Sequence, residues 1–293
     1  MAPLASSASA VARPIPLLTP VRITILPVRS ILRVMFRIKN VLQGNAARRL
    51  LGAGATLGAV LLLAACGKDH ETDCLKSTGK VTTERRELAP FRILTANDNV
   101  DVTLVQDAET YAEVRTGKNL QEDIELTVSN GQLVIKNTSR CNWMRRYDTP
   151  REVTLHLPRL LDVRLHGQGN VRTAGNFRAD TLFCHLVGAG DFDLDISSHY
   201  LNLDMYELGD VSIRGRADDA KLLVGGSGTL RAQGLQTRQC SLRLTKDSDG
   251  DAFVSFAEAL FGSHAGTGTV HYQGNPAQVS LQVTDKGKVL QGN

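Results

Sequence analysis

A short glycine turn recurs about every 20 residues through the second half of the chain. Six copies follow one another as HGQGNV, VGAGDF, YELGDV, GGSGTL, DSDGDA and AGTGTV, with last glycines Gly169, Gly190, Gly209, Gly228, Gly250 and Gly268. The intervals between these glycines are 21, 19, 19, 22 and 18 residues. A unit this short cannot bury its own apolar side chains, so neighbouring units must stack on one another. The period therefore predicts a chain wound into stacked coils.

Apolar and polar residues alternate on both sides of each turn. Leu182, Cys184 and Leu186 stand eight, six and four positions before one glycine, and similar sets precede the others. The fifth repeat keeps the pattern if its turn holds two extra residues. Alternation with period two is typical of strands with one buried face, and no comparable run shows helical spacing. Two positions after the glycines stand Val171, Phe192, Val211, Leu230, Ala252 and Val270.

The two patterns together predict an all-β fold, a β-solenoid (β-helix) with rungs of about 20 residues. Inward apolar side chains would form ladders along its axis. We expect the turn glycines to supply backbone conformations with positive φ, which other residues adopt only at a cost. We expect the small polar residue after each glycine to bond nearby backbone amides. These residues are Asn170, Asp191, Asp210, Thr229, Asp251 and Thr269.

The segments that flank the repeats are also rich in alternating residues. Residues 75–160 could form opening rungs or a small capping sheet, with a hairpin-like turn at Ser129-Asn130-Gly131. The tail, VSLQVTDKGKVLQGN, can supply one closing rung.

The fifth turn also resembles a calcium loop. DSDGDAFVSFAE, residues 247–258, has carboxylates at positions 1, 3, 5 and 12. An EF-hand needs an entering helix and a glycine at position 6. Here SLRLTK alternates as a strand does, and position 6 is Ala252, which belongs to the inward column. We therefore interpret this stretch as a solvated acidic turn of the repeat and predict no metal site.

Charge divides the chain near residue 65. The first 65 residues hold eight of the 34 Lys and Arg and no acidic residue, which leaves 26 basic residues against 30 acidic ones. The formal net charge of +4 therefore becomes −4 for residues 66–293. Because the basic residues in excess belong to the leader, net charge gives no support to a nucleic-acid partner.

The end of the leader has the sequence pattern of a lipoprotein signal peptide. An apolar run from Leu50 to Ala65 follows two arginines; it is short for a bilayer span and typical of a secretory signal core. The run closes on Leu-Ala-Ala-Cys66, which resembles the lipobox of bacterial lipoprotein signals, where the chain is cut before a cysteine that carries diacylglycerol. We expect residues 1–65 to be a leader with a lipoprotein signal peptide, Met35 to be its true start, and Cys66 to be the lipid attachment site.

Residues 66–80 read as a flexible polar linker, and residues 81–293 as the solenoid domain. Cys184 and Cys240 fall in different inward columns three rungs apart, about 14 Å at the usual strand spacing. That distance is too long for a disulfide, so we expect two buried free thiols. Cys74 and Cys141 both precede the repeats and are the candidate disulfide of an exported chain.

Several short segments resemble one known family when they are taken together. They are DCLKSTG (residues 73–79), SRCNWMRRY (139–147), the turns VGAGD and ELGD, and VHYQGNP (270–276). The combination resembles the head GIN domain of auto-transporter adhesins, common in Bacteroidetes lipoproteins, over about residues 73–290. The resemblance implies a right-handed, single-stranded β-helix and an adhesin-like role. Glu207 and Ser248 stand where the family's turn usually has its first glycine, which leaves the local turn shape open.

Common catalytic motifs are absent from the sequence. It contains no GxSxG, HExxH or Walker-type loop, and the glycine-rich GAGATLG lies inside the signal. The seven histidines are scattered, and we interpret each as a surface histidine with satisfied hydrogen bonds. The sharpest enzyme alternative is a polysaccharide lyase, for which Asp191, Asp210 and Asp251 could form a metal stripe. Uncharged Asn and Thr fill the same column in the other turns, as a capping role predicts.

We therefore predict a protein that is not an enzyme and has no cofactor. The predicted role is a lipid-anchored binding or adhesion module of the cell envelope, on the outer membrane and exposed at the surface. Its partners would be the membrane, through the lipid at Cys66, and a protein or glycan ligand. The alternative is a structural or regulatory envelope lipoprotein.

Overall fold

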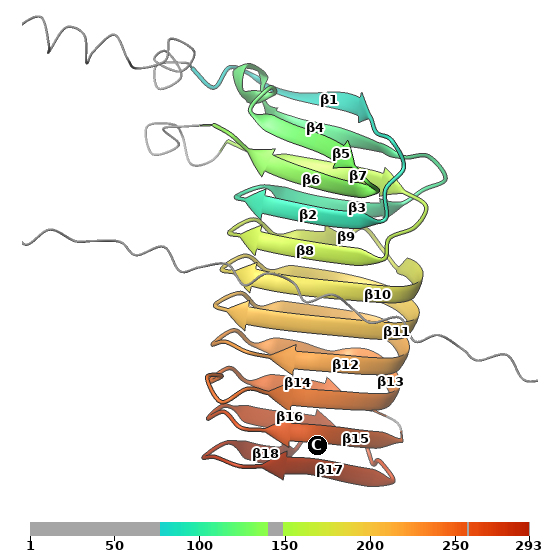
Figure 1. Ribbon diagram of the computed structural model, residues 1–293, viewed down its shortest axis with the longest axis vertical. Coiled ribbons are helices and arrows are strands. Elements are labelled where there is room, and N and C mark those ends of the chain that lie inside the picture. Colours follow the sequence, from blue (N-terminus) through green and yellow to red (C-terminus); the bar gives the residue numbers. More distant parts are fainter. Residues whose placement is uncertain (1–76, 140–148, 257, 293) are drawn as a thin grey trace, which may run out of the picture. The chain divides into compact units, whose positions relative to one another are not determined.

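The computed structural model describes residues 77–139, 149–256 and 258–292. These residues are almost entirely strand and turn, and their one helical segment is a 3₁₀ turn, Lys118–Leu120. The strands stack into a β-solenoid, which confirms the predicted fold class (Figure 1). No helix among the described residues is long and apolar enough to cross a membrane. The predicted leader and the sites Cys66, Cys74 and Cys141 lie outside the described residues.

Four long strands form the regular part of the solenoid. The ribbon of each strand curves at one edge of the stack, so its two halves lie in two layers (Figure 1). The glycine turns join successive strands at the opposite edge. The strands are β10 (Phe177–Gly188), β11 (Phe192–Glu207), β12 (Val211–Val224) and β13 (Leu230–Leu244), each parallel to the next.

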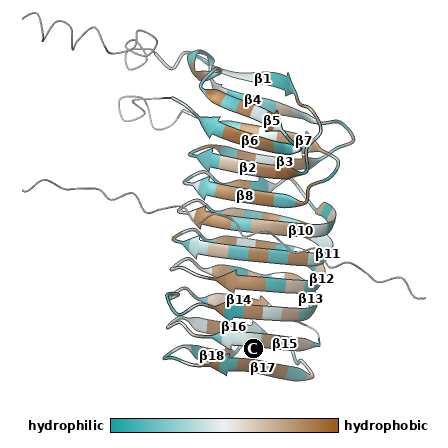
Figure 2. Ribbon diagram, in the orientation of Figure 1, coloured by the Kyte–Doolittle hydropathy of each residue, from teal (hydrophilic) through white to brown (hydrophobic). Residues whose placement is uncertain are grey.

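Residues one repeat apart face each other, as the repeat predicts. Leu182, Leu201, Ala220 and Cys240 form one inward ladder, and every member is at most 4% exposed. Cys184 pairs with Leu203 in a different ladder. Both cysteines are buried free thiols, which confirms their predicted state. Brown and teal alternate along the strands in Figure 2, because inward apolar residues alternate with outward polar ones.

Shorter strands continue both layers to the end of the chain. β14, β16 and β18 pair in one layer, and β15 and β17 pair in the other, so the tail supplies the predicted closing rung. Val279, Val283 and Leu290 are exposed in this last rung. The strands are β14 (Ala252–Ser255), β15 (Ala259–His264), β16 (Thr269–Gln273), β17 (Gln278–Val283) and β18 (Lys288–Gln291).

Stacking order departs from chain order at the start of the solenoid. The first rung in the chain, β2 with β3, lies between the second, β6 with β7, and the third, β8 with β9. All of these contacts are parallel. The strands are β2 (Ile93–Asp98), β3 (Asp101–Gln106), β6 (Gln132–Asn137), β7 (Glu152–Leu157), β8 (Asp162–Gly167) and β9 (Val171–Thr173).

Three antiparallel strands cover the end of the stack beyond β6 and β7. They are β1 (Val81–Glu87), β4 (Tyr111–Gly117) and β5 (Ile124–Ser129). β4 pairs with β1 and β7, and β5 pairs with β6 through the predicted hairpin. The guanidinium of Arg85 lies 3.6 Å from the ring centre of Tyr111, which stacks on His156 at 4.1 Å. The region before the repeats therefore contains both opening rungs and a cap, which protects this sheet edge.

The turn glycines are required for a different reason from the one predicted. None of the six last glycines has a positive φ. A Cβ on Gly190 would instead lie 1.8 Å from the carbonyl oxygen of Gly169, and one on Gly228 would lie 1.9 Å from that of Gly209. The expectation of positive φ is thus wrong at these positions, because close approach of successive rungs excludes a side chain there.

Positive φ occurs instead two residues before the last glycine in the first three repeats. Gly167 and Gly188 have φ values of 136° and 132°, and Glu207, the aligned residue of the third repeat, has a φ of 70°. Glu207 therefore keeps a left-handed backbone despite its side chain. In the fifth turn, buried Ser248 takes another route, since its hydroxyl donates to the carbonyl of Gly226 at 3.0 Å.

Candidate functional site

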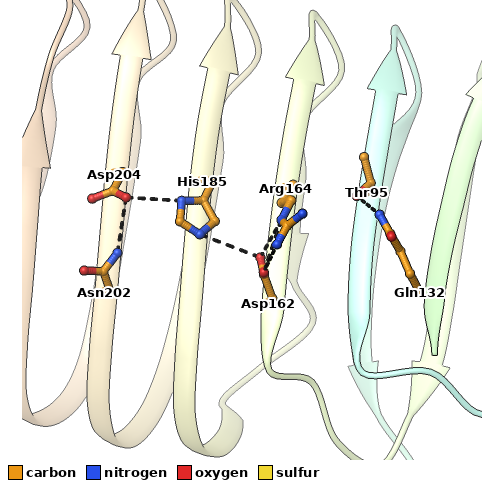
Figure 3. A network of polar contacts seen from close by, with 7 residues as sticks. All are labelled: Thr95, Gln132, Asp162, Arg164, His185, Asn202 and Asp204. Atoms are coloured by element: carbon orange, nitrogen blue, oxygen red, sulfur yellow. Dashed lines mark hydrogen bonds and ion pairs between the residues drawn. The ribbon is translucent and has the colours of Figure 1, made fainter. Parts of the chain in front are cut away.

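A row of polar side chains crosses the outward face of one layer. We call it the polar row, and Figure 3 shows its side chains on neighbouring strands. These strands are β6, β2, β8, β10 and β11, and each pairs with the next. The solenoid builds it by register, because Arg164 faces His185 on the next rung and His185 faces Asp204 on the one after. Its members are Gln132, Thr95, Asp162, Arg164, His185, Asn202 and Asp204.

His185 lies at the centre of the row, between two carboxylates. Its Nδ1 is 3.2 Å from Oδ2 of Asp204, and its Nε2 is 3.8 Å from Oδ1 of Asp162. Arg164 donates from Nε to Oδ2 of Asp162 at 3.1 Å, and Asn202 donates to Oδ2 of Asp204 at 3.3 Å. The contacts link three successive rungs, so each side chain is held by a neighbour on another rung or on its own strand.

Three members of the row, Thr95, Asp162 and Asn202, are buried although they are on an outward face. Asp162 is 7% exposed and Asn202 is 9% exposed. A buried carboxylate is costly unless it is paired, and Arg164 supplies the partner. The hydrogen bond with Asp162 in turn raises the pKa of the Arg164 guanidinium. Because an ionised carboxylate has about four acceptor positions, the row keeps acceptors for a ligand in a fixed arrangement.

The same face continues beyond Asp204 into a hollow of about 280 Å³ over β11, β12, β13 and β15. Asn202 and Asp204 belong to both the row and the hollow. Lys221 and Arg243 line its other side, so carboxylate and cationic groups face one cavity. Gly262 also lines the hollow, where it exposes its backbone because it has no side chain. This combination suits a polar ligand with hydrogen-bonding groups.

The aspartates of the glycine turns are not arranged as a metal site. Oδ1 of Asp210 accepts the backbone amide of Thr229 at 2.8 Å, and Oδ1 of Asp251 accepts that of Thr269 at 2.7 Å. Burial alone would raise the pKa of Asp210, but hydrogen bonds from Arg231 and from the Thr229 amide hold it below its ordinary value. These contacts confirm the predicted capping role for the aspartates. The part of the chain that the structure describes holds no group of three metal-binding side chains.

The calcium-like stretch belongs to this series of turns. Strand β13 precedes it where an EF-hand has a helix, and Ala252 begins β14 with its side chain fully buried. Asp247 and Asp249 are exposed. The interpretation as an acidic turn of the solenoid agrees with this geometry.

The sequence did not reveal the polar row, although a signal for it was present. Arg164, His185 and Asp204 each stand five residues before the last glycine of their repeat. Aligning the repeats on their outward residues, as well as on their inward ones, would have placed them side by side. The interpretation of the histidines holds for His199, which is exposed and hydrogen-bonded to Asp218, and is wrong for His264. His264 is fully buried in β15, and its Nε2 donates to the carbonyl of Gly268 at 2.8 Å.

Comparison with known proteins identifies the family. A family model described as "Putative auto-transporter adhesin, head GIN domain" matches residues 90–276, well over half of the chain. The chain belongs to this family. The polar row, the neighbouring hollow and all six glycine turns lie within the matched head GIN domain.

Solved structures share the fold of this head GIN domain. A structure described as a putative adhesin from Bacteroides fragilis has a TM-score of 0.67 and 21% identity, and covers 73% of this chain and 97% of its own. A putative adhesin from Parabacteroides distasonis has a TM-score of 0.59 and 20% identity, covering 73% and 98%. A putative lipid binding protein from the same species has a TM-score of 0.59 and 18% identity, covering 74% and 98%. No curated protein matches the chain.

Proposed function

We propose that this head GIN domain is a non-catalytic binding module, which uses the polar row to hold a protein or glycan ligand at the cell surface. The observation that carries the proposal is the register of Arg164, His185 and Asp204 on adjacent rungs. Parallel strands hold such side chains about 4.8 Å apart on a rigid sheet. A ligand therefore meets groups that are already ordered, which lowers the entropy cost of binding.

The chemistry of the row supports binding rather than catalysis. Nucleophilic catalysis needs a hydroxyl or thiol within reach of a base. His185 contacts carboxylates, and the neighbouring thiol of Cys184 faces the core on the other side of the strand. Burial raises the pKa of that thiol, which opposes formation of a thiolate. The family description as an adhesin agrees with a binding role.

We propose further that the module is exported and anchored to the outer membrane by lipid on Cys66, with a disulfide between Cys74 and Cys141. The lipobox-like Leu-Ala-Ala-Cys66 and the basic flank of the leader support this. Labelling cells with a radioactive fatty acid tests the anchor. The parent chain should incorporate label and fractionate with membranes, whereas Cys66→Ser should do neither. Proteolytic shaving of whole cells tests surface exposure.

The binding role is tested with the full chain carrying Cys66→Ser, on a glycan array and on immobilised envelope extracts. We expect a bound component whose affinity falls when His185→Ala and Asp204→Ala are combined. Lys246→Ala is the matched control, because Lys246 is exposed in the fifth turn, away from the row. Absence of any bound component on both surfaces would overturn the proposal and favour the structural or regulatory alternative. Release of unsaturated sugar products that absorb in the ultraviolet would show a lyase instead.

A further inference from the structure

Most arginines in the described part of the chain have a carboxylate partner. Four arginines differ, because Arg92, Arg159, Arg178 and Arg243 have no side-chain hydrogen bond or ion pair within the described residues. The first three are exposed and line a single hollow of about 500 Å³, whereas Arg243 lines the hollow beyond Asp204. The arginines with a carboxylate partner are Arg85, Arg86, Arg115, Arg164, Arg214, Arg216, Arg231 and Arg238.

Arg92, Arg159 and Arg178 come from separate segments of the sequence, and hydrogen bonds to the backbone hold these segments together. The side chain of Gln106 donates to the carbonyls of Pro158 and Arg178 at 3.1 and 2.9 Å, and accepts the amide of Arg178 at 3.0 Å. The carbonyl of Arg92 accepts the amide of Leu161 at 2.8 Å. The backbone of the cluster is therefore held in place before a ligand binds, and only the arginine side chains have to be ordered.

The hollow extends along the edge of the stack where the long strands curve. A second hollow of about 280 Å³ shares Arg178, Ala179 and His199 with it and reaches Arg216 and Asp218. We call the two together the arginine groove. Asp218 is already engaged by His199 at 2.8 Å and by Arg216 at 3.2 Å. Asp180 also lines the first hollow and has no ion pair within the described residues, so the groove holds three unpaired guanidinium groups against one unpaired carboxylate.

We propose that the arginine groove binds an acidic polysaccharide through the anionic groups of that polymer. A guanidinium holds a carboxylate or sulfate through two parallel hydrogen bonds, and an unpaired exposed arginine is ready to do so. The groove follows the stacking axis across several rungs, which suits a linear polymer with charges repeated along its length. The site lies at the edge of the stack and not on the outward face that carries the polar row.

Other polyanions fit the groove less well. Binding of single-stranded nucleic acid relies on aromatic side chains on which bases stack, and the residues that line the groove include no Phe, Tyr or Trp. An anionic bilayer presents a flat surface, whereas the arginines here line a cavity. Charge complementarity together with shape therefore favours an acidic polysaccharide.

The test measures binding of the full chain with Cys66→Ser to four immobilised probes: polygalacturonate, dextran sulfate, single-stranded poly-dT and phosphatidylglycerol vesicles. We expect polysaccharide binding that weakens with salt, since the contacts are ionic. Binding to polygalacturonate would assign carboxylate as the bound group, and binding to dextran sulfate alone would assign sulfate. Binding only to poly-dT or vesicles, or to none of the probes, would overturn the proposal.

Two variants that lose the same charge show whether the arginines of the groove, or only the net charge of the protein, bind the polymer. The first combines Arg92→Gln, Arg159→Gln and Arg178→Gln, and the second combines Lys246→Gln, Lys286→Gln and Lys288→Gln. All six side chains are exposed, so both variants should keep the circular dichroism spectrum and melting temperature of the parent. We expect the arginine variant to lose at least about tenfold in polysaccharide affinity, because charge-assisted hydrogen bonds are lost. Equal losses in the two variants would show that net charge alone attracts the polymer.

Discussion

The carboxylate of Asp191 accepts a hydrogen bond from the backbone amide of Asp210, one rung further along the solenoid, at 2.9 Å. Asn170 accepts the amide of Asp191 in the same way at 3.0 Å, and Asp210 accepts that of Thr229 at 2.8 Å. A single position of the repeat therefore links four successive turns. These side chains give an acceptor to the backbone amide that follows each of the next turn glycines, so hydrogen bonds link successive turns as they link successive strands.

Asp191→Ala removes one link of this ladder and should destabilise the protein by about 1 kcal/mol, the usual net contribution of such a hydrogen bond. Asp191→Asn should keep most of the parent's stability, because Asn170 already accepts the equivalent hydrogen bond with an amide oxygen. Urea denaturation followed by circular dichroism measures both. If the Asn variant were as unstable as the Ala variant, Asp191 would stabilise the protein through its charge and not by accepting a hydrogen bond.

Gly190→Ala and Gly175→Ala distinguish the two reasons for a glycine in this fold. A Cβ on Gly190 meets the carbonyl of Gly169, so we expect a loss of roughly 3 kcal/mol from overpacking. Gly175 has a φ of 85° and open space around it, so its Ala variant should lose only about 1 kcal/mol from backbone strain. Urea midpoints of the two variants provide the comparison. Equal losses would contradict close approach as the reason for the turn glycines.

The repeat predicted the inward ladders because burial follows from alternation alone. Counting back from the turn glycines aligns Leu182, Leu201 and Cys240, and these residues share one ladder in the structure. The same counting explains why the thiols were correctly separated. The sequence of a strand thus predicts which of its side chains are buried, provided that a fixed position such as the turn glycine sets the register.

The stacking of β2 and β3 between other rungs was not predictable in this way. Alternation shows that Leu94 and Leu133 are inward, but it does not show which rung lies next to which. The polar row depends on that order, since Thr95 meets Gln132 from the rung on one side and Arg164 from the rung on the other. The arginine groove was equally hidden, because only this insertion brings Arg92, just before β2, next to the segment of Arg159, just before β8.

Both core thiols should be unreactive in the folded protein. Burial raises the pKa of Cys240 to about 12 and raises that of Cys184 further, so neither forms a thiolate at neutral pH. A chain in which Cys66, Cys74 and Cys141 are replaced by Ser should give no colour with Ellman's reagent until denaturant is added, and then two thiols per chain. Rapid reaction without denaturant would contradict the closed packing of the two ladders.

A thiol count also tests the proposed bridge between Cys74 and Cys141. In the Cys66→Ser chain purified without reductant, guanidinium should expose two thiols, from Cys184 and Cys240. Reduction before denaturation should raise the count to four. Removing a native disulfide typically costs about 2–5 kcal/mol in a small secreted domain, so Cys74→Ser should also lower the urea midpoint. Four thiols without reduction would show that the bridge does not form.

Acid should weaken the solenoid through its paired aspartates. Hydrogen bonds lower the pKa of Asp210, as they do for Asp107 beside His156 and for Asp218 beside His199. A folded pKa below the unfolded value of about 3.9 contributes stability that is complete above that value. The contribution is lost as the pH falls through the lower folded pKa. We therefore expect the free energy of unfolding to decrease below about pH 4.

Asp210→Asn isolates one of these groups. The amide can still accept the hydrogen bond from Thr229 but cannot ionise, so the decrease in stability toward acid should be smaller than in the parent chain. The effect should be modest, because the Asp210 side chain is 40% exposed and solvent screens its pairing with Arg231. Asp249→Asn, an exposed change in the fifth turn, is the control and should keep the parent's pH profile. Melting temperatures measured from pH 2 to pH 6 give the comparison, and identical profiles for Asp210→Asn and the parent would contradict the role of this carboxylate.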